Sequence, residues 1–311
     1  MGISRKKIYK YCMQLKKKVD ISIIIIGYNT LKELTELLKS INLIEINKSI
    51  EVVYVDDGSK DHSYDFFNSY LIKFSKNSYR IKRNKGRAFA TKKGASISSG
   101  DWLYFIRSNE VILKNTLSEY FKIINGGGIF AIMGVVKYRC KDTRFENYLN
   151  SNYRGISKYA SGSKIDYNYL LLNNSIIHQS ILKKIHLNKD FDKYGGEELD
   201  FSFRLNKNYP GQTIACPKAI VLRNNYPILA EHCKRLIEFG KNNFKLLSFE
   251  LKLKVIKYQF LLNPKMKPWI DIINKLCIFL YKIDFRFKKI NYTIIRLLML
   301  CAILRGYHKG S

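Results

Sequence analysis

Two adjacent carboxylates are the first residues of this chain that could do chemistry. Asp56 and Asp57 directly follow an apolar run, Val52–Val55, and precede Gly58 and Ser59. Ligands of an α/β sheet bind at the carboxyl ends of its strands, so both acids are expected at a ligand edge. A carboxylate there can accept hydrogen bonds from a nucleobase or a ribose. The same residues also suit a plain strand-to-helix turn, in which Asp and Ser cap and Gly adopts a positive φ.

A second acidic pair, Glu197 and Glu198, follows Gly195 and Gly196 where a loop is predicted to enter a helix. The helix dipole stabilises a carboxylate near a helix N-terminus as the anion, and neighbouring acids push their pKa values apart. One of the two could therefore act as the general base for a hydroxyl group. The alternative is a helix that only carries glutamate in its first turn.

The stretch Gly100–Glu110 is predicted to be a buried strand that ends in a polar tip. The tip consists of Arg107, Ser108, Asn109 and Glu110. In a nucleotide-binding sheet this position normally offers carboxylates to a divalent cation that bridges phosphates. Here only Glu110 is anionic, so the tip departs from that chemistry.

The elements that position these side chains alternate between strand and helix. The β-branched run at 21–26 predicts a strand buried on both faces, as in a parallel sheet. Thr30 and Glu33 form a predicted capping box for a helix that continues to Ile41. Further strands are predicted at 51–55, 79–83, 100–106, 129–138, 170–177 and 213–222, and the polar segment 140–168 is predicted to be a loop over a cleft. This order predicts an α/β fold with a mostly parallel sheet flanked by helices.

The composition limits the classes of protein to consider. The chain has 311 residues, 46% of them hydrophobic, and a formal net charge of +30, so it can form a packed core and favours an anionic partner. Six scattered cysteines without zinc-ligand spacing suit a reducing cytoplasm. The five histidines lie in no catalytic or metal-binding motif. No nucleic-acid-binding signature is present, so nucleic acid is not expected as a partner.

Both ends of the chain are basic. Residues 1–20 form a predicted basic arm whose lysines interrupt any apolar core of a signal peptide. Residues 228–311 are predicted to form basic amphipathic helices, with 15 Lys or Arg against three acidic residues from 241 onward. The apolar segments 269–281 and 292–304 are shorter than the roughly 18 residues needed to span a bilayer, and they carry charges. We therefore expect contact with an anionic membrane surface; a helical cap on the core is the alternative.

Four motifs occur together in one order. They are SIIIIGYN at 22–29, VVYVDDGS at 52–59, NKGRAFATKKGASISSGDWLYF at 84–105 and GGEELDFSFRL at 195–205. As a set, this pattern resembles the family 2 glycosyltransferases. The resemblance implies a GT-A fold, a nucleotide-sugar-binding α/β domain, over residues 21–227. The basic helices at 228–311 would then be an extension of that domain.

The resemblance also implies roles for individual residues. Tyr28 and Asn29 match the turn that borders the nucleotide, and Asp56 and Asp57 match the acids that contact uracil or ribose. Glu197 and Glu198 match the acidic pair that faces the acceptor. Glu198 takes the position of the catalytic base, which would deprotonate an acceptor hydroxyl. That hydroxyl would attack the anomeric carbon of the donor sugar and invert its configuration.

Two departures concern the metal ion of the family. Its D-x-D motif for Mg²⁺ or Mn²⁺ reads Arg107-Ser108-Asn109 here, and Arg223 lies where many members have a metal-binding histidine. Three interpretations follow. Arg107 or Arg223 could supply a fixed cation to the diphosphate. A weak metal site could remain on Glu110 and Asn109. The protein could also be catalytically inactive.

We expect an inverting glycosyltransferase that uses a nucleotide-sugar, with UDP favoured. The expected acceptor is a lipid-linked glycan of bacterial surface polysaccharide synthesis, reached from the cytoplasmic face of the cell membrane by a peripheral protein. Two alternatives remain: a glycosyltransferase that acts on protein or peptide, and an inactive sugar-nucleotide-binding subunit of an assembly complex.

Overall fold

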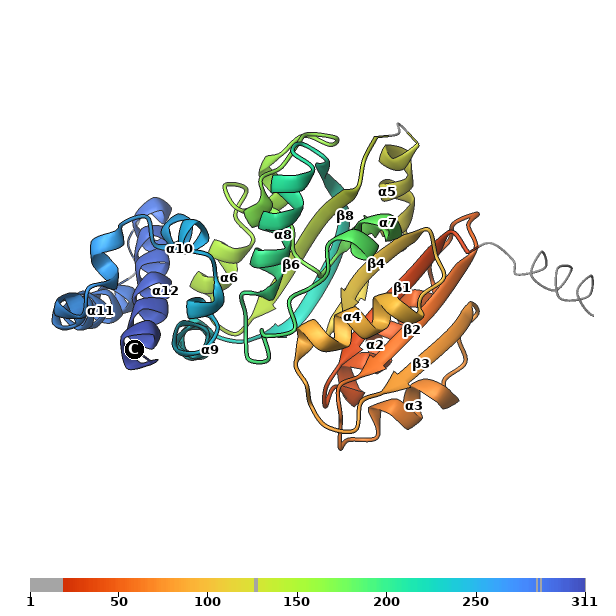
Figure 1. The fold of residues 1–311 in the computed structure, drawn as a ribbon, viewed down its shortest axis with the longest axis horizontal. Helices are drawn as coiled ribbons and strands as arrows, with labels where there is room; N and C mark the ends of the chain where they lie inside the picture. Colours follow the sequence, from red (N-terminus) through yellow and green to blue (C-terminus); the bar gives the residue numbers. More distant parts are fainter. Residues whose placement is uncertain (1–18, 126–127, 284, 286, 311) are drawn as a thin grey trace, which may run out of the picture.

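The structure, a computed structural model, describes residues 19–125, 128–283, 285 and 287–310. The predicted basic arm lies outside the described residues, apart from Val19 and Asp20. The described chain forms an α/β domain, with a group of four helices from the C-terminal part of the chain at one end of it (Figure 1). The predicted fold class is thereby confirmed.

One eight-stranded sheet organises the α/β domain. Its order is β3-β2-β1-β4-β7-β6-β8-β5. The strands in that order are Ser75–Arg80, Ile50–Asp56, Ile21–Gly27, Trp102–Arg107, Ser175–His178, Ala131–Cys140, Thr213–Tyr226 and Glu110–Ile112. The first four are parallel, β7 runs antiparallel to both of its neighbours, and β5 is antiparallel to β8. The sheet is therefore mixed, with its parallel half at the N-terminal end of the chain.

The parallel half follows from the apolar runs. All of β2 and nearly all of β1 are buried, which is the pattern of strands covered on both faces. The register pairs Gly27 with Asp56, and Ile26 with Arg107. The residues that follow these strands are therefore brought to a common edge of the sheet.

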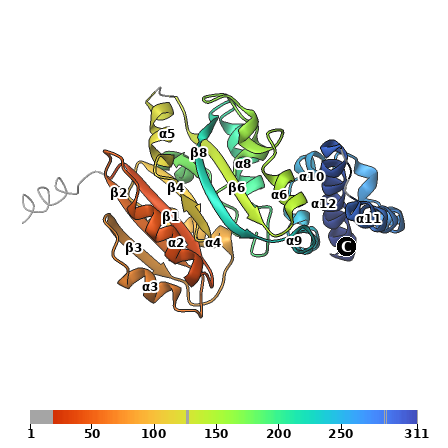
Figure 2. The ribbon, with the colours of Figure 1, turned by 180° about the vertical axis from the view of Figure 1, so that it is seen from behind.

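Helices cover the two faces of the sheet (Figures 1 and 2). One face packs against α2 (Leu31–Asn42), α3 (Ser63–Ser69) and α5 (Thr116–Ile124). The other packs against α4 (Arg87–Ile97), α7 (Gln179–Lys184) and α8 (Glu197–Asn208). Since α4 and α8 both begin at the carboxyl edge of the strands, their first residues can meet there.

The predicted capping box at Thr30 does not form. The Thr30 hydroxyl is buried without a hydrogen-bond partner, and no side chain of the helix itself caps α2. Instead the Asp61 carboxylate accepts from the Leu31 amide at 2.8 Å. A residue from the neighbouring loop therefore supplies the acceptor that the first turn of α2 needs.

The segment predicted to be a polar loop at 140–168 contains a helix. Within it lie α6 (Thr143–Leu149) and a short 3₁₀ helix, η1 (Gly155–Lys158). The Asp142 carboxylate caps α6 by accepting from the Phe145 amide at 3.1 Å. Phe145 and Leu149 are buried, so this short helix is held by packing as well as by its cap.

The C-terminal helices form their own packed group. They are α9 (Leu229–Lys241), α10 (Phe249–Ile256), α11 (Lys267–Lys282) and α12 (Lys288–Gly310). The backbones of α9 and α12 come into close contact, because a Cβ added at Gly240 would collide with the Ile303 carbonyl, and one at Gly306 with that of Ile237. Glycine is required at this crossing for lack of space.

The last helix corrects one expectation. The apolar segment 292–304 is predicted to be too short to cross a bilayer, whereas α12 has 23 residues and contains an 18-residue stretch with a mean hydropathy of 1.3. By length and composition it could cross a membrane, and it is the one such helix in the described part of the chain. About 39% of that stretch is buried, and α12 packs against α9 and α11, as the core helix of a soluble domain also would.

Candidate functional site

Asp57, rather than Asp56, lines a cavity at the edge of the parallel strands, although only 3% of it is exposed. The cavity has a volume of about 390 Å³. The Asp57 carboxylate accepts from the Lys85 amide at 2.9 Å. Burial raises the pKa of Asp57, and hydrogen bonds from the amides of Lys85 and Gly86 oppose that rise. The carboxylate is thus held in place by backbone donors at the wall of the cavity.

Asp56 lies deeper, where it contacts other residues of the protein. It is fully buried, its Oδ2 accepts from the Ser59 amide at 3.1 Å, and Arg80 lies 3.7 Å from the same oxygen. Its Oδ1 has no hydrogen-bond partner. Asp56 therefore shapes the turn after β2 and keeps one unused acceptor.

Tyr28 and Asn29 play different parts in the neighbouring turn. Asn29 has a φ of 51°, its amide donates to the Ser59 hydroxyl at 2.9 Å, and its side-chain oxygen accepts from the Lys60 amide at 2.8 Å. Its side chain is therefore used to fix the turn. Tyr28 is 47% exposed and lines the same cavity as Asp57. An exposed aromatic face beside a carboxylate is suited to a nucleobase.

Two glycines place the acidic pair at the start of α8. Gly195 and Gly196 have φ values of 83° and 95°, which other residues rarely adopt. A Cβ at Gly196 would lie 2.8 Å from Phe191 and 2.9 Å from Phe239. The chain therefore turns tightly into α8, and both Glu197 and Glu198 are buried there.

Two arginines hold the acidic pair. Arg87, at the start of α4, forms a short ion pair with Glu197 and lies 3.5 Å from Glu198 Oε2. Arg107, at the end of β4, donates to Glu198 Oε1 at 3.1 Å. The Leu172 amide donates to the same oxygen at 3.1 Å. The carboxylates thus receive donors from three separate parts of the fold.

This environment fixes the charge of Glu198. Burial alone would raise the pKa of Glu198, but the charges of Arg87 and Arg107 and the Leu172 amide outweigh burial and lower that pKa. Glu198 is therefore an anion at neutral pH. A buried carboxylate in that state can accept a proton from a hydroxyl group brought next to it.

Sequence reasoning missed the role of Arg87. The sequence did carry a signal, since Arg87 lies in the motif at 84–105. In the structure Arg87 and Thr91, one turn further along α4, both line a recess. That recess has a volume of about 140 Å³ and is also lined by Arg107, Ser108 and Asn109. The polar tip of β4 therefore does face the site, and Asn109 is at its wall.

Glu110 closes the turn after β4. It is fully buried, its Oε2 accepts from the Arg107 amide at 3.0 Å, and its Oε1 accepts from the Asn173 side chain at 3.3 Å. Both oxygens are thus engaged by protein donors. Glu110 holds the backbone of Arg107 rather than facing the recess.

The residues at this tip do not fit the divalent cation that the resemblance implies. Mg²⁺ and Mn²⁺ need several oxygen ligands. Glu110 is occupied by its own turn, and Arg107 places a positive charge in the recess. Among the described residues no three His, Cys, Asp or Glu side chains form a cluster that could hold a metal. The positive charges beside Glu197 and Glu198 are those of Arg87 and Arg107.

Arg223 lies apart from the acidic pair. It pairs in register with Glu110 across β5 and β8, and it is buried. Its guanidinium lies over the ring of Tyr226 at 5.0 Å, and its Nε has no hydrogen-bond partner. No ion pair joins it to an acidic residue of the described chain. The structure thus brings Arg107, Glu197 and Glu198 together and leaves Arg223 in different surroundings.

Comparison with known proteins identifies relatives of the chain. Residues 22–186 match the family described as Glycosyl transferase family 2. An uncharacterized glycosyltransferase of Bacillus subtilis, YfnE, is 26% identical over 186 residues, which cover 57% of this chain and 47% of that protein. The glycosyltransferase GlyG of Streptococcus pneumoniae is 26% identical over 115 residues, covering 37% and 38%. The chain therefore spans less than half the length of these two relatives.

A solved structure shares the fold. The S. aureus protein TarS, residues 1–349, crystallised in complex with UDP-GlcNAc, superimposes with a TM-score of 0.57 at 18% identity. The match covers 94% of this chain and 93% of that one, so it extends over the C-terminal helices as well as the sheet.

Proposed function

The chain belongs to glycosyl transferase family 2, and from that premise we propose that it transfers a sugar from a UDP-sugar to a hydroxyl group of an acceptor. One observation carries the proposal. Glu198 lies at the carboxyl edge of the sheet, is held as an anion by Arg87 and Arg107, and adjoins the recess lined by the tip of β4. A base, fixed positive charge and space for a ligand are thus combined in one place.

The transfer needs one proton acceptor and one group that stabilises the leaving diphosphate. Glu198 takes the proton of the acceptor hydroxyl, and the oxygen forms a bond to the anomeric carbon of the sugar. The bond between that carbon and the diphosphate breaks, and its electron pair leaves with the diphosphate. As Glu198 takes up the proton, the charge of Arg107 is no longer compensated, and Arg107 can stabilise this group from the recess. Attack opposite to the leaving group inverts the anomeric configuration.

The nucleotide would occupy the cavity lined by Tyr28 and Asp57. Tyr28 offers a ring face, and the Asp57 carboxylate can accept from uracil or ribose. The complex of TarS with UDP-GlcNAc supports a UDP-sugar as the donor. Arg87 lines this cavity and the recess beside Arg107, so it would link the nucleotide to the reacting carbon.

Transfer assays with purified protein test this function. UDP- and GDP-sugars would be incubated with and without EDTA, and release of the nucleotide diphosphate followed. We expect turnover with a UDP-sugar that persists in EDTA and is lost in Glu198→Gln. Nucleotide binding without turnover for every donor would contradict the proposal and favour an inactive sugar-nucleotide-binding subunit.

We further propose that the protein acts on the inner face of a bacterial cell membrane, on a lipid-linked acceptor of surface polysaccharide synthesis. The support comes from α11, which lies at the far end of the molecule from the sheet (Figure 1). Four of its apolar side chains share one helical face and are between 54% and 62% exposed: Trp269, Ile272, Leu276 and Phe279. Lysines 267, 275 and 282 lie on the same helix. An apolar face accompanied by lysines matches an anionic bilayer.

A further inference from the structure

Three arginines converge at the end of the domain formed by β6, β8 and α9. Arg154 precedes η1, Arg223 lies on β8, and Arg235 lies on α9. None of the three forms an ion pair with an acidic side chain among the residues that the structure describes. Arg223 is only 7% exposed and its Nε has no hydrogen-bond partner. Arg154 is half-buried, and its guanidinium donates to the Leu149 carbonyl at 3.4 Å and interacts with Tyr148.

Aromatic rings, not carboxylates, face these guanidinium groups. Arg154 lies 5.1 Å from the centre of the Tyr148 ring, Arg223 lies 5.0 Å from that of Tyr226, and Arg235 lies 6.0 Å from that of Tyr194. Ring faces attract cations, but they do not neutralise them. The cluster therefore keeps its positive charge and its hydrogen-bond donors.

The pKa of the buried imidazole of His232 is affected by the same three arginines. The imidazole lies beside Tyr226, whose hydroxyl is 3.3 Å from Nδ1. Burial and then the charges of Arg154, Arg235 and Arg223 lower the pKa of His232 to about 4. The contacts agree with this: Arg223 lies over Tyr226, which packs beside His232. Arg154 lies over Tyr148, which stacks on Phe145, and Phe145 also packs beside the imidazole. His232 is neutral at pH 7 and adds no charge of its own.

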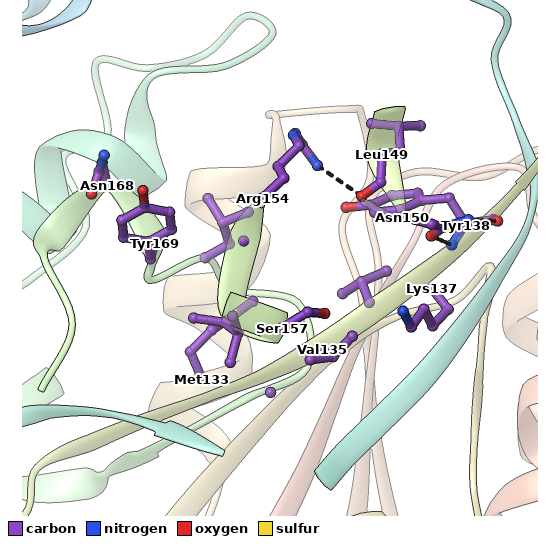
Figure 3. Close-up of a pocket in the computed structure, with 15 residues that line it drawn as sticks. Met133, Val135, Lys137, Tyr138, Leu149, Asn150, Arg154, Ser157, Asn168 and Tyr169 are labelled. Atoms are coloured by element: carbon purple, nitrogen blue, oxygen red, sulfur yellow. Dashed lines mark hydrogen bonds between the residues drawn. The ribbon is translucent and has the colours of Figure 1, made fainter. Parts of the chain in front are cut away.

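A cavity adjoins the cluster at Arg154. It has a volume of about 150 Å³ and is lined by Arg154, Tyr138, Asn150 and Leu171, among others (Figure 3). Leu171 precedes Leu172, whose amide holds Glu198. Figure 3 shows Arg154 bonded to the Leu149 carbonyl on the side of the cavity where Asn150 and Tyr138 lie. A ligand in this cavity would contact Arg154, and the chain segment that lines the cavity at Leu171 continues to the amide that holds Glu198.

We propose that Arg154, Arg223 and Arg235 bind a phosphate group of the acceptor substrate. This inference rests on the proposed function. Guanidinium groups donate paired hydrogen bonds that match the oxygens of a phosphate. The buried, uncompensated charge of Arg223 is costly to keep unless an anion joins it, while Arg154 is half-buried and Arg235 is exposed.

The position of the arginines relative to the sheet favours the acceptor, rather than the donor, as the source of the bound phosphate. The cavity with Tyr28 and Asp57 belongs to β1 and β2, on one side of β4, whereas β6 and β8 lie on the other side. Tyr194 lines the donor cavity and faces Arg235, so the two sites adjoin. A phosphate on the acceptor would thus be held beside the donor while its hydroxyl meets Glu198.

The test uses the full chain, saturated with UDP, and sn-glycerol 3-phosphate as the probe. Binding is followed by ligand-observed NMR, with glycerol as the uncharged comparison. We expect the probe to bind in the presence of UDP, and the double variant Arg154→Gln, Arg223→Gln to weaken it at least about tenfold, for the loss of two charge-assisted contacts. The affinity for UDP should change less than about twofold in that variant. Arg305→Gln, which removes a charge already paired with Asp271, serves as the matched control and should change neither affinity.

Three results would overturn the inference. Displacement of the probe by UDP, or an equal loss of UDP affinity in the double variant, would assign the arginines to the donor diphosphate. Unchanged binding of the probe by the double variant would show that these arginines do not bind it. Because binding is measured without turnover, an inactive Glu198→Gln protein that still binds the probe would separate failure of the proposed function from failure of this site.

Stability gives a second readout. Arg223→Met removes an uncompensated buried charge, so the free protein should melt at a higher temperature while its affinity for the probe falls. A purely structural arginine would lower the melting temperature when replaced, and that result would contradict the proposal.

Discussion

The arginines on the two sides of Glu198 face different partners. Arg87 and Arg107 meet the carboxylates of Glu197 and Glu198, whereas Arg154 and Arg223 meet tyrosine rings. In the first group each charge is compensated, and the result is a base held as an anion. In the second group the charges remain available. The comparison indicates that the same residue type preorganises a catalytic carboxylate in one place and a binding site for an anion in the other.

The largest effect is expected at the base itself. Glu198→Gln keeps the size of the side chain but cannot accept the proton, so turnover should fall by about 10³-fold, as for loss of a general base. Initial rates with a UDP-sugar measure this. Glu197→Gln is the neighbouring control and should lose clearly less activity, since Glu197 is engaged by Arg87. Equal losses in the two variants would count against the assignment of Glu198.

The next prediction compares the two groups of arginines by the effect of their replacement on the free energy of unfolding. Arg87→Met leaves Glu197 buried without its cation, which should lower the free energy of unfolding by about 4 kcal/mol. Arg223→Met should raise that free energy instead, because no carboxylate depends on it. Urea unfolding of both variants measures the two signs. Destabilisation by both would show that the second group is also part of a compensated network.

A pH dependence follows from His232. Its pKa is about 4 in the folded protein against 6.5 normally, so the unfolded chain binds a proton more readily between these values. The free energy of unfolding should therefore fall as the pH drops from 6.5 to 4, by roughly 3 kcal/mol. The charges that face the ring are those of Arg154, Arg223 and Arg235.

Unfolding of His232→Gln at pH 7 and pH 4 isolates this part of the acid sensitivity. The variant should lose less stability than the unmodified protein over this interval. An unchanged pH dependence would mean that burial and the three charges together do not lower the pKa of this imidazole. Glu198, whose pKa is lowered, contributes stability that is lost only below its ordinary value of 4.5 and so acts at the acid end of the interval.

The smallest effect is expected at the membrane. Replacing Leu276 and Phe279 by serine should weaken binding to vesicles that contain phosphatidylglycerol by about tenfold, with transfer to a soluble acceptor unchanged. Sedimentation with the vesicles measures this. Leu71→Ser, at a side chain that is 88% exposed on the sheet domain, is the matched control. Equal binding by all three proteins would contradict the proposed role of α11.

The sequence predicted the parallel half of the sheet well because the information is local. A run such as Ile21–Ile26 specifies a strand buried on both faces, and the acids that follow Val55 mark its carboxyl end. Glu197 and Glu198 could be placed at a helix start for the same reason, since the two preceding glycines mark the turn.

Long-range partners could not be predicted in this way. Arg87 and Glu197 are 110 residues apart, and Asp61 caps a helix that begins 30 residues earlier. No local pattern distinguishes Arg154 or Arg235 from the many other cations of a chain with a net charge of +30. Only the fold shows which groups face these two arginines, and those groups are tyrosine rings.

The central claim is that Glu198, held as an anion by two arginines, supports transfer without a divalent cation. The most direct measurement is the initial rate of UDP release from UDP-GlcNAc by the full chain, with and without EDTA. The account predicts equal rates in both conditions and loss of the rate in Glu198→Gln. A rate that EDTA abolishes and Mn²⁺ restores would contradict it.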